Sequence, residues 1–427
     1  MIDSNSLDLL EPVTFDDSVE KFTYLTFKPY NSGGLGYSDE IRIGINNRDF
    51  IVAPHVSYLC ISGRVHRNNS TTFIHAMPWN GLMYLFSTIT FEINGVPVDR
   101  VHNAGVTTTI KSYLSKTVSE SKYYDSCGFN HMSNPYTSAY KITSSGYFQI
   151  YLPARFILGI FEDYRKPFTN CVLELILSRA KDDKNVFIHP GRAAAAADTD
   201  ITAVDPTITL SEVSWKVPVL KLSDSARLQM LQTMKDNRTI SIPFRTWEMF
   251  EYPTLPTSTN HSWTIKTSHS LHKPRYVIVA FQTDRRNLYS ANASLFDNIH
   301  LQSFQLSLND EKYPYEPPNL DVTNVQRDLL YHMFANFQVS YYKKPFPETC
   351  FSASDFLGDT SAYPIPMIVI DTSKQKEQET NVSGPINIRL DFVCSSNVPA
   401  NTTAYCLIIY DRWFAYSAFD GNIKQIL

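Results

Sequence analysis

The sequence is poor in charge and in long apolar runs. Only 19% of its 427 residues are charged and the formal net charge is −4, so the chain lacks the general basic surface that nucleic acid attracts. No run of 18 apolar residues occurs, and no apolar leader segment opens the sequence. We therefore expect a protein that neither spans a membrane nor is secreted.

The sequence also lacks paired cysteines. Its six cysteines are scattered without a C-x-x-C pair, and several lie in strand-like apolar runs, where a reduced cysteine acts as a small hydrophobe. We expect free buried thiols rather than disulfides. The sequons Asn69-Ser70-Thr71 and Asn401-Thr402-Thr403 are then ordinary Asn-rich loops.

Motifs of nucleotide, hydrolase and metal chemistry are missing too. The run Gly33-Gly34-Leu35-Gly36 has no following Lys-Ser/Thr, so it predicts a flexible loop and not a phosphate-binding one. No G-x-S-x-G, H-x-H or H-E-x-x-H occurs. His66, His75 and His102 are too dispersed to predict a metal site.

Adjacent carboxylates are the remaining candidates for acid–base chemistry. Glu162-Asp163 and Asp182-Asp183 are such pairs, but a chain with 42 acidic residues contains pairs by chance. Asp182-Asp183 follows Arg179-Ala180-Lys181 in a polar stretch, and we expect it on a solvated surface. The sequence thus predicts no catalytic, cofactor-binding or metal-binding residue, no cofactor, and no enzyme.

Aromatic and apolar residues are what the chain has in quantity. Hydrophobic residues make up 43%, with 25 Tyr and 26 Phe. Many aromatics with little charge favour extensive β-structure or a large buried interface, and both readings stay open.

The chain also repeats itself at an offset of about 215 to 220 residues. Four weak matches occur in the same order, which predicts two copies of one fold of about 200 residues. The matched stretches are 58–62 with 276–280, 89–95 with 304–310, 121–124 with 340–342, and 173–177 with 389–393.

Alternating apolar residues predict strands in both copies. Ile89, Phe91 and Ile93 alternate and run into Asn94-Gly95, the strongest short hairpin signal because both turn positions need φ above zero. In the second copy the same alternation ends at Asn309-Asp310, a weaker turn of the same kind.

One helix is predicted after each hairpin, packed on a sheet or neighbour. The first carries an apolar stripe at helical spacing from Val106 to Thr117. The second carries a cleaner stripe from Val322 to Phe337, with Asp321 as its N-cap.

The two copies meet near residue 223. Residues 189–200 predict an exposed loop, and 208–210 and 213–217 the last strands of the first copy. Ser223 or Asp224 then caps a helix carrying Leu228, Leu231 and Met234. We predict an all-β chain of two tandem antiparallel β-sandwich jelly rolls with short helices in loops. Residues 1–222 form the first with its N-terminal extension, and 223–427 form the linking helix and the second.

A set of stretches resembles a known family. In and after the boundary region they are residues 209–223, with Val213-Ser214-Trp215-Lys216-Val217-Pro218 at their centre, 226–234, 240–248 (Ile240-Ser241-Ile242-Pro243-Phe244-Arg245-Thr246-Trp247-Glu248), 274–281, 298–301 and 308–314. In the first half they are residues 151–164 and 173–175. The chain is similar to the double jelly-roll major capsid proteins, in particular those of Maverick/Polinton elements and the related adintoviruses.

The resemblance implies a structural protein of a viral shell. It implies a homotrimer whose six jelly rolls form a pseudo-hexameric capsomer of an icosahedral double-stranded DNA virus or virus-like element. Its partners are then itself, neighbouring capsomers, and minor or penton capsid proteins. It would be made in the host cytoplasm, assembled in the nucleus or cytoplasm, and located in the virion capsid.

A different class of protein is the alternative. Two jelly rolls also build glycan-binding or glycan-processing proteins, which need convergent acids or exposed aromatics in one cleft. The lack of a leader segment and of distinctive acids counts against this alternative.

The acidic start of the chain gives a testable expectation. The first twenty residues carry six acids and no Lys or Arg, whereas a phosphate-binding arm needs cations to release counterions from DNA. The isolated trimer should therefore bind duplex DNA weakly in a filter or anisotropy assay. Tight binding at physiological salt would contradict this.

Overall fold

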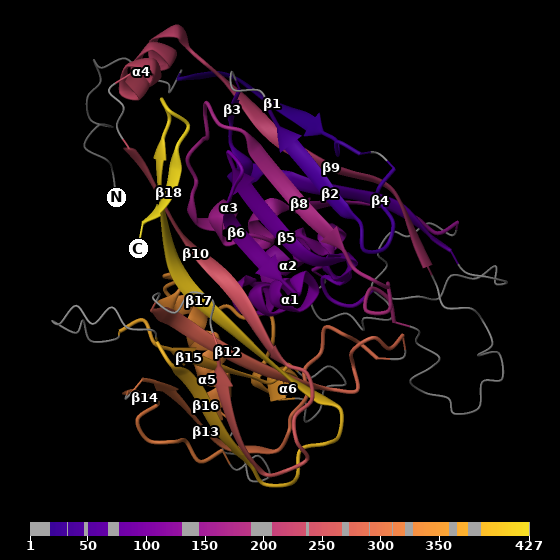
Figure 1. Cartoon of the computed structure of the whole chain (residues 1–427). Coiled ribbons are helices and arrows are strands. Elements are labelled where there is room, and N and C mark those ends of the chain that lie inside the picture. The colour runs from indigo at the N-terminus through magenta and orange to yellow at the C-terminus, as the bar shows by residue number, and fades with distance from the viewer. Residues whose placement is uncertain are drawn as a thin grey trace, which may run out of the picture.

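Four antiparallel sheets pair into two sandwiches (Figure 1). No helix in the described part of the chain is long and apolar enough to cross a bilayer. The computed structural model describes residues 18–31, 33–46, 50–66, 77–129, 145–188, 207–235, 239–266, 273–289, 291–309, 311–320, 328–357, 365–374 and 386–426.

The first sandwich consists of a sheet in the order β1-β9-β4-β7, with β3 also paired to β9, and a sheet in the order β2-β8-β5-β6. Its strands are β1 (Val19–Phe27), β2 (Glu40–Ile45), β3 (Ile51–Val52), β4 (Tyr58–His66), β5 (Phe86–Ile93), β6 (Val96–His102), β7 (Tyr147–Pro153), β8 (Leu173–Arg179) and β9 (Thr207–Leu222).

The second sandwich repeats this order strand for strand. One sheet is β10-β17-β12-β15 with β18 added on β17, and the other is β11-β16-β13-β14. This order is that of a jelly roll, so the predicted fold class is confirmed. The strands are β10 (Thr239–Tyr252), β11 (Asn260–Ile265), β12 (Pro274–Thr283), β13 (Leu301–Leu308), β14 (Glu311–Tyr313), β15 (Met367–Asp371), β16 (Ile388–Cys394), β17 (Thr402–Ser417) and β18 (Ile423–Ile426).

Three of the four sequence matches fall in equivalent strands, namely β4 with β12, β5 with β13, and β8 with β16. The fourth falls in the helical segments between equivalent strands. The two strands predicted at 208–210 and 213–217 are wrong in one respect, because they form the single 16-residue strand β9. The first sandwich ends with β9 at Leu222, and the division into domains at residue 223 stays a prediction.

An asparagine at the turn closes the β5–β6 hairpin and the β13–β14 hairpin with the same pair of hydrogen bonds. Asn94 lies at φ 50° and Gly95 at φ 79°, as the predicted turn requires. The Asn94 backbone N donates to Val172 O at 2.8 Å, and its Oδ1 accepts from Val172 N at 2.7 Å. Asn309, at φ 53°, makes the same two bonds with Asn387. Each asparagine thereby ties its hairpin to the start of the neighbouring strand.

Helices lie in the loops, as predicted: α1 (Ala104–Ser115), α2 (Val118–Tyr123), α3 (Gly159–Asp163), α4 (Asp224–Lys235), α5 (Asp328–Ser340) and α6 (Ala353–Leu357). The first predicted helix ends at Ser115, because Thr117 instead caps α2 in a capping box with Glu120. The predicted N-cap Asp321 and the loop at 189–200 lie outside the described residues.

Aromatic side chains fill the space between the sheets. In the first sandwich, Trp215 of β9 lies with its ring 6.2 Å from that of Phe91 and 6.1 Å from that of Phe161. In the second, Phe281 and Phe392 face each other across the two sheets at 5.3 Å. The six cysteines are free thiols, and all except Cys127 are buried.

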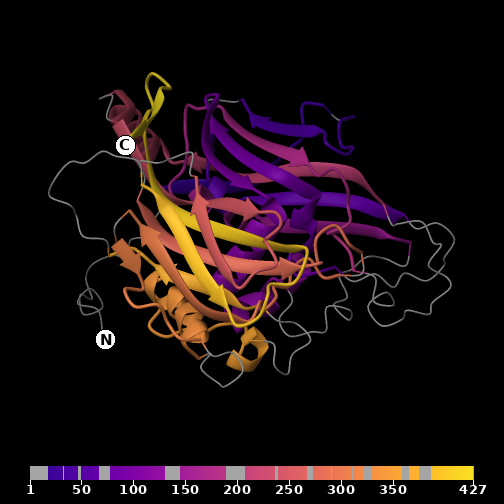
Figure 2. The same cartoon turned by 60° about the horizontal axis from the view of Figure 1, so that its bottom comes forward.

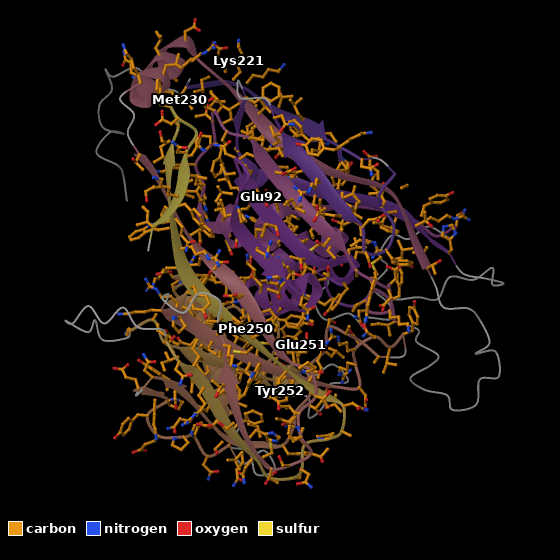
Figure 3. All side chains as sticks on the ribbon, in the orientation of Figure 1. Glu92, Lys221, Met230, Phe250, Glu251 and Tyr252 are labelled. Atoms are coloured by element: carbon orange, nitrogen blue, oxygen red, sulfur yellow. The ribbon has the colours of Figure 1, made fainter. Side chains whose placement is uncertain are left out.

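The two longest strands of the second sandwich extend beyond its own core. β10 and β17 pair along 14 residues and run out beside the first sandwich, ending near α4 and β18 (Figures 1 and 2). Figure 3 places Lys221 and Met230 at this far end, well away from the strand end marked by Phe250, Glu251 and Tyr252.

A buried ion pair holds together the end of β8, the connection between β1 and β2, and the start of β9 in the first sandwich. Arg179 Nη2 lies 2.5 Å from Asp183 Oδ1, and both side chains are almost fully buried. Asp183 Oδ2 also accepts from the Tyr37 hydroxyl at 2.7 Å and from the Ile208 backbone N at 2.9 Å. The expectation that Asp182-Asp183 lies on a solvated surface is wrong for Asp183. The side chain of Asp183 is buried because the start of β9 lies against the loop that holds it. Burial and the bond to Asp183 raise the pKa of Tyr37 to about 12.

Asp183→Ala should lower the free energy of unfolding by about 3–5 kcal/mol, because it leaves the Arg179 guanidinium buried without its carboxylate. Asp182→Ala is the matched control, since Asp182 accepts only a local bond from Lys184 N at 3.2 Å among those described. Urea unfolding of both variants tests this. Equal losses would show that the ion pair is not what stabilises the loop.

Candidate functional surfaces

The residues considered for chemistry do not come together. Among the described residues, no three His, Cys, Asp or Glu side chains are placed to share a metal ion. His66 lies in β4 and His102 ends β6, while His75 is outside the described residues. The glycine run forms a turn between β1 and β2, where Gly36 N donates to Asp39 Oδ2 at 2.7 Å. The side chains of the described residues instead build contact surfaces between the two sandwiches.

The most developed of these surfaces joins the two sandwiches along β10. Thr246 of β10 donates from Oγ1 to Asp99 Oδ1 in β6 at 2.7 Å, and both residues are buried. Asp99 Oδ2 accepts from Ile160 N of α3 at 3.1 Å. One carboxylate thus binds a strand of each sandwich and the start of a helix.

Arg245, the neighbour of Thr246, makes the ion pair of this junction. Its Nε and backbone N donate to Asp163 Oδ2 at 2.9 and 2.8 Å, and its Nη2 donates to Oδ1 at 2.5 Å. The guanidinium carbon lies 3.6 Å from the centre of the Tyr341 ring. Burial alone would lower the pKa of Arg245, but the bonds to Asp163 outweigh it and hold the pKa above its usual value.

Close approach of α3 to β10 requires a glycine. A Cβ built on Gly159 would lie 1.8 Å from the Arg245 carbonyl oxygen, so any larger residue forces the two sandwiches apart. Next to it, Lys111 of α1 lies 2.9 Å from Glu162 and 5.4 Å from the Trp247 ring centre. The two acids considered above for acid–base chemistry therefore each bind a cation at the junction: Glu162 binds Lys111, and Asp163 binds Arg245.

Further bonds continue the junction in both directions. Arg412 Nη1 donates to Val98 O at 3.3 Å, and Asn94 Nδ2 donates to Gly421 O at 2.6 Å. On the other side the hydroxyls of Tyr84 and Tyr113 donate to Ala293 O and Ser294 O, both at 2.8 Å. The junction therefore runs from the β17–β18 turn to the loop before β13.

Sequence reasoning missed the central residues of this junction. It singled out Glu162-Asp163 but not their partners, and it passed over Asp99 and Arg245. The signal that was present is a cation inside the apolar run Ile242-Pro243-Phe244-Arg245-Thr246-Trp247, since a strand interior rarely holds an arginine without a buried partner.

A family model described as a double jelly roll-like domain matches residues 76–414. This chain belongs to that family. The matched span begins after β4 and ends within β17, and it includes Asp99, Asp163, Arg245 and Thr246 of the junction. A comparison with curated protein sequences finds no match.

Solved structures similar to this double jelly roll chain share its fold at low sequence identity. A chain in the cryo-EM structure of the Sputnik virophage matches with TM-score 0.63 and 12% identity, covering 100% of this chain and 92% of its own. The mavirus major capsid protein matches with TM-score 0.60 and 12% identity, covering 100% and 93%. The Faustovirus major capsid protein gives 0.56 and 8%, covering 98% and 93%.

Apolar surface remains open on the double jelly roll chain. Val19, Phe22 and Tyr24 of β1 are exposed, and Tyr24 packs on Tyr58 with ring centres 5.9 Å apart. Leu228 and Leu231, predicted as the apolar stripe of the linking helix, are exposed on α4. Their exposure means that the described chain does not itself supply the partner of this stripe.

A lysine beside the junction is buried among aromatic rings. Lys116 is 1% exposed, and its Nζ lies 3.0 Å from the Phe156 ring centre and 4.0 Å from that of Phe129. Nζ has no hydrogen-bond partner among the described residues. Burial lowers the pKa of Lys116 well below its usual value. The Lys116 carbonyl accepts from Gln338 Nε2 at 3.2 Å, which fixes the backbone across the junction.

Lys116→Met should raise the free energy of unfolding at pH 7 by about 1–4 kcal/mol, because methionine removes the cost of burying a side chain that is charged in the unfolded chain. The folded chain holds this proton less tightly than the unfolded chain, whose lysine pKa is 10.5. Wild-type stability should therefore recover with rising pH, and the advantage of Lys116→Met should shrink towards pH 10.5.

Thermal or urea unfolding of both proteins at several pH values measures this difference. Lys122→Met, at an exposed position on α2, is the control and should change stability little at any pH. A gain that does not vary with pH would show that packing, and not desolvation of the ammonium, is responsible.

Proposed function

We propose that this chain is the major capsid protein of an icosahedral double-stranded DNA virus or virus-like element. The observation that carries the proposal is the fixed junction of two jelly rolls in one chain. A rigid pair of equivalent sandwiches is a unit from which three copies make a ring with six similar positions. The fold shared with the mavirus and Faustovirus major capsid proteins supports the same function.

The proposed assembly unit is a homotrimer, a pseudo-hexameric capsomer that tiles a shell with its neighbours. Open aromatic and aliphatic side chains on β1 and α4 support self-association, because interfaces are enriched in such residues and depleted in charge. The proposed role is structural and not enzymatic. Partners are other copies of the chain and minor or penton capsid proteins, and the location is the virion.

The finer placement among Maverick/Polinton elements and adintoviruses is part of this proposal and depends on the sequence resemblance. Synthesis in the host cytoplasm, with assembly in the nucleus or cytoplasm, is likewise proposed from that resemblance. Sequencing the DNA packaged in particles that contain this protein tests the placement.

The purified chain should have a mass near three times 48.7 kDa in light scattering, and electron micrographs should show shells or hexagonal arrays. A stable monomer that binds a glycan in an array assay would contradict the proposal and favour the alternative of a two-domain glycan-binding or glycan-processing protein.

A further inference from the structure

Each side of the junction has a counterpart elsewhere in the chain, because the two jelly rolls repeat one strand order. The first roll contributes β6 and α1, which correspond to β14 and α5 in the second by their places in the chain. The second roll contributes β10, which corresponds to β1 in the first. The junction buries side chains on β10 and α1, whereas the equivalent elements β1 and α5 keep apolar side chains exposed.

The edge strands β10 and β1 differ in burial although both pair with a long strand. In β10, Thr246 and Trp247 are buried at the junction. No residue of β1 is fully buried, and Phe22 is 50% exposed. The first roll covers β10, whereas no described segment covers β1 in the same way.

The two loop helices differ in the same sense. In α1, the eleven residues from Ala104 to Leu114 are all buried. In α5, Leu330, Phe334 and Phe337 are buried, while Leu329 is 47% exposed. A surface hollow of about 320 Å³ lies along the open side of α5, lined by His332, Met333, Ala335, Asn336 and Pro347.

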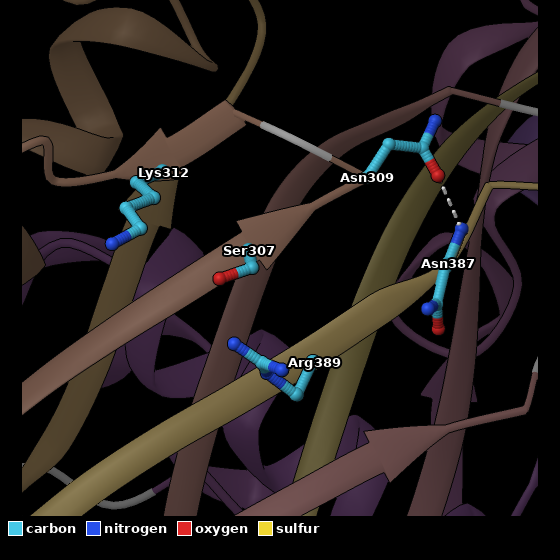
Figure 4. Close-up of a pocket in the computed structure, with 5 residues that line it drawn as sticks. All are labelled: Ser307, Asn309, Lys312, Asn387 and Arg389. Atoms are coloured by element: carbon cyan, nitrogen blue, oxygen red, sulfur yellow. Dashed lines mark hydrogen bonds between the residues drawn. The ribbon is translucent and has the colours of Figure 1, made fainter.

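The asparagines at the two hairpin turns differ in the same sense. Asn94 at the β5–β6 turn binds Gly421 across the junction. Its counterpart Asn309 lies in an open hollow of about 290 Å³ at the end of β13, and Tyr315 after β14 is 83% exposed. Figure 4 shows the hollow with the residues that line it: Ser307, Asn309, Lys312, Asn387 and Arg389.

We propose that β1 of one copy packs on the β14–α5 face of a second copy, repeating between chains the junction that joins β10 to β6 and α1 within each chain. The proposal rests on the proposed capsomer and names its two contact faces. Each chain has one face of each kind, so the contact is head-to-tail, and in the proposed homotrimer three such contacts close a ring. The apolar residues Val19, Phe22 and Leu329, together with Tyr315, are then the buried part of the contact.

The test uses one glutamate on each face. Phe22→Glu and Tyr315→Glu should each weaken trimer formation by about 30-fold or more, because each buries a carboxylate without a partner. Light scattering across a concentration series measures the mass, and far-UV circular dichroism checks that each variant is folded. Both side chains are exposed in the single chain, so the fold should be kept.

Mixing the two variants gives the sharper result. A Phe22→Glu chain keeps an intact β14–α5 face, and a Tyr315→Glu chain keeps an intact β1. The mixture should therefore form one-to-one dimers that cannot close into a ring, while each variant alone stays monomeric. A mixture without dimers would overturn the head-to-tail contact.

Tyr30→Glu is the matched control. Tyr30 is 56% exposed in the connection after β1, and the matching connection after β10 bonds within the second roll, where Thr403 Oγ1 donates to Pro253 O. This variant should remain trimeric. Trimers from Phe22→Glu or Tyr315→Glu would overturn the assigned faces and leave the capsid function standing, whereas a monomeric wild-type chain would overturn both.

Discussion

The contact of Arg245 and Thr246 with Asp163 and Asp99 is the constraint on which the rest of this structure depends. It sets how the second jelly roll lies on the first, and every surface that either roll presents outward follows from that placement. The contact needs a small residue at Gly159, where α3 approaches the β10 backbone. It also needs the two acids to be held in place, which the N-terminus of α3 and the adjacent Lys111–Glu162 pair provide.

The junction within the chain is centred on polar pairs, whereas its counterparts on the surface include the exposed apolar and aromatic side chains of Phe22, Leu329 and Tyr315. A buried ion pair costs desolvation and adds little stability, but its geometry permits only one arrangement of the partners. Such a contact suits two rolls that are tethered and fold together. Exposed Phe22 and Tyr315 suit a contact between chains, because burying aromatic surface from water drives association once folding is complete.

Local signals in the sequence predicted the parts of the fold that depend on near neighbours. Asn94-Gly95 predicted a hairpin because only those φ values close the turn, and the alternation of Ile89, Phe91 and Ile93 predicted which side faces the core. Signals that depend on distant residues failed. Asp183 looked solvated because Tyr37 and strand β9, which cover it, meet it only after folding. The sequence placed Leu228 and Leu231 on the linking helix, but it did not show that both side chains are exposed there.

The sequence by itself determined that the chain holds two copies of an antiparallel sandwich, because strand alternation, turn residues and the repeat offset are all encoded within short windows. It also determined the absence of recognisable catalytic motifs. Only the tertiary structure decided which carboxylates are buried, how the rolls are joined, and which of two equivalent faces stays open. Those properties depend on contacts between residues more than 80 positions apart, such as Asp163 with Arg245 and Asp99 with Thr246, and no local pattern encodes such a pairing.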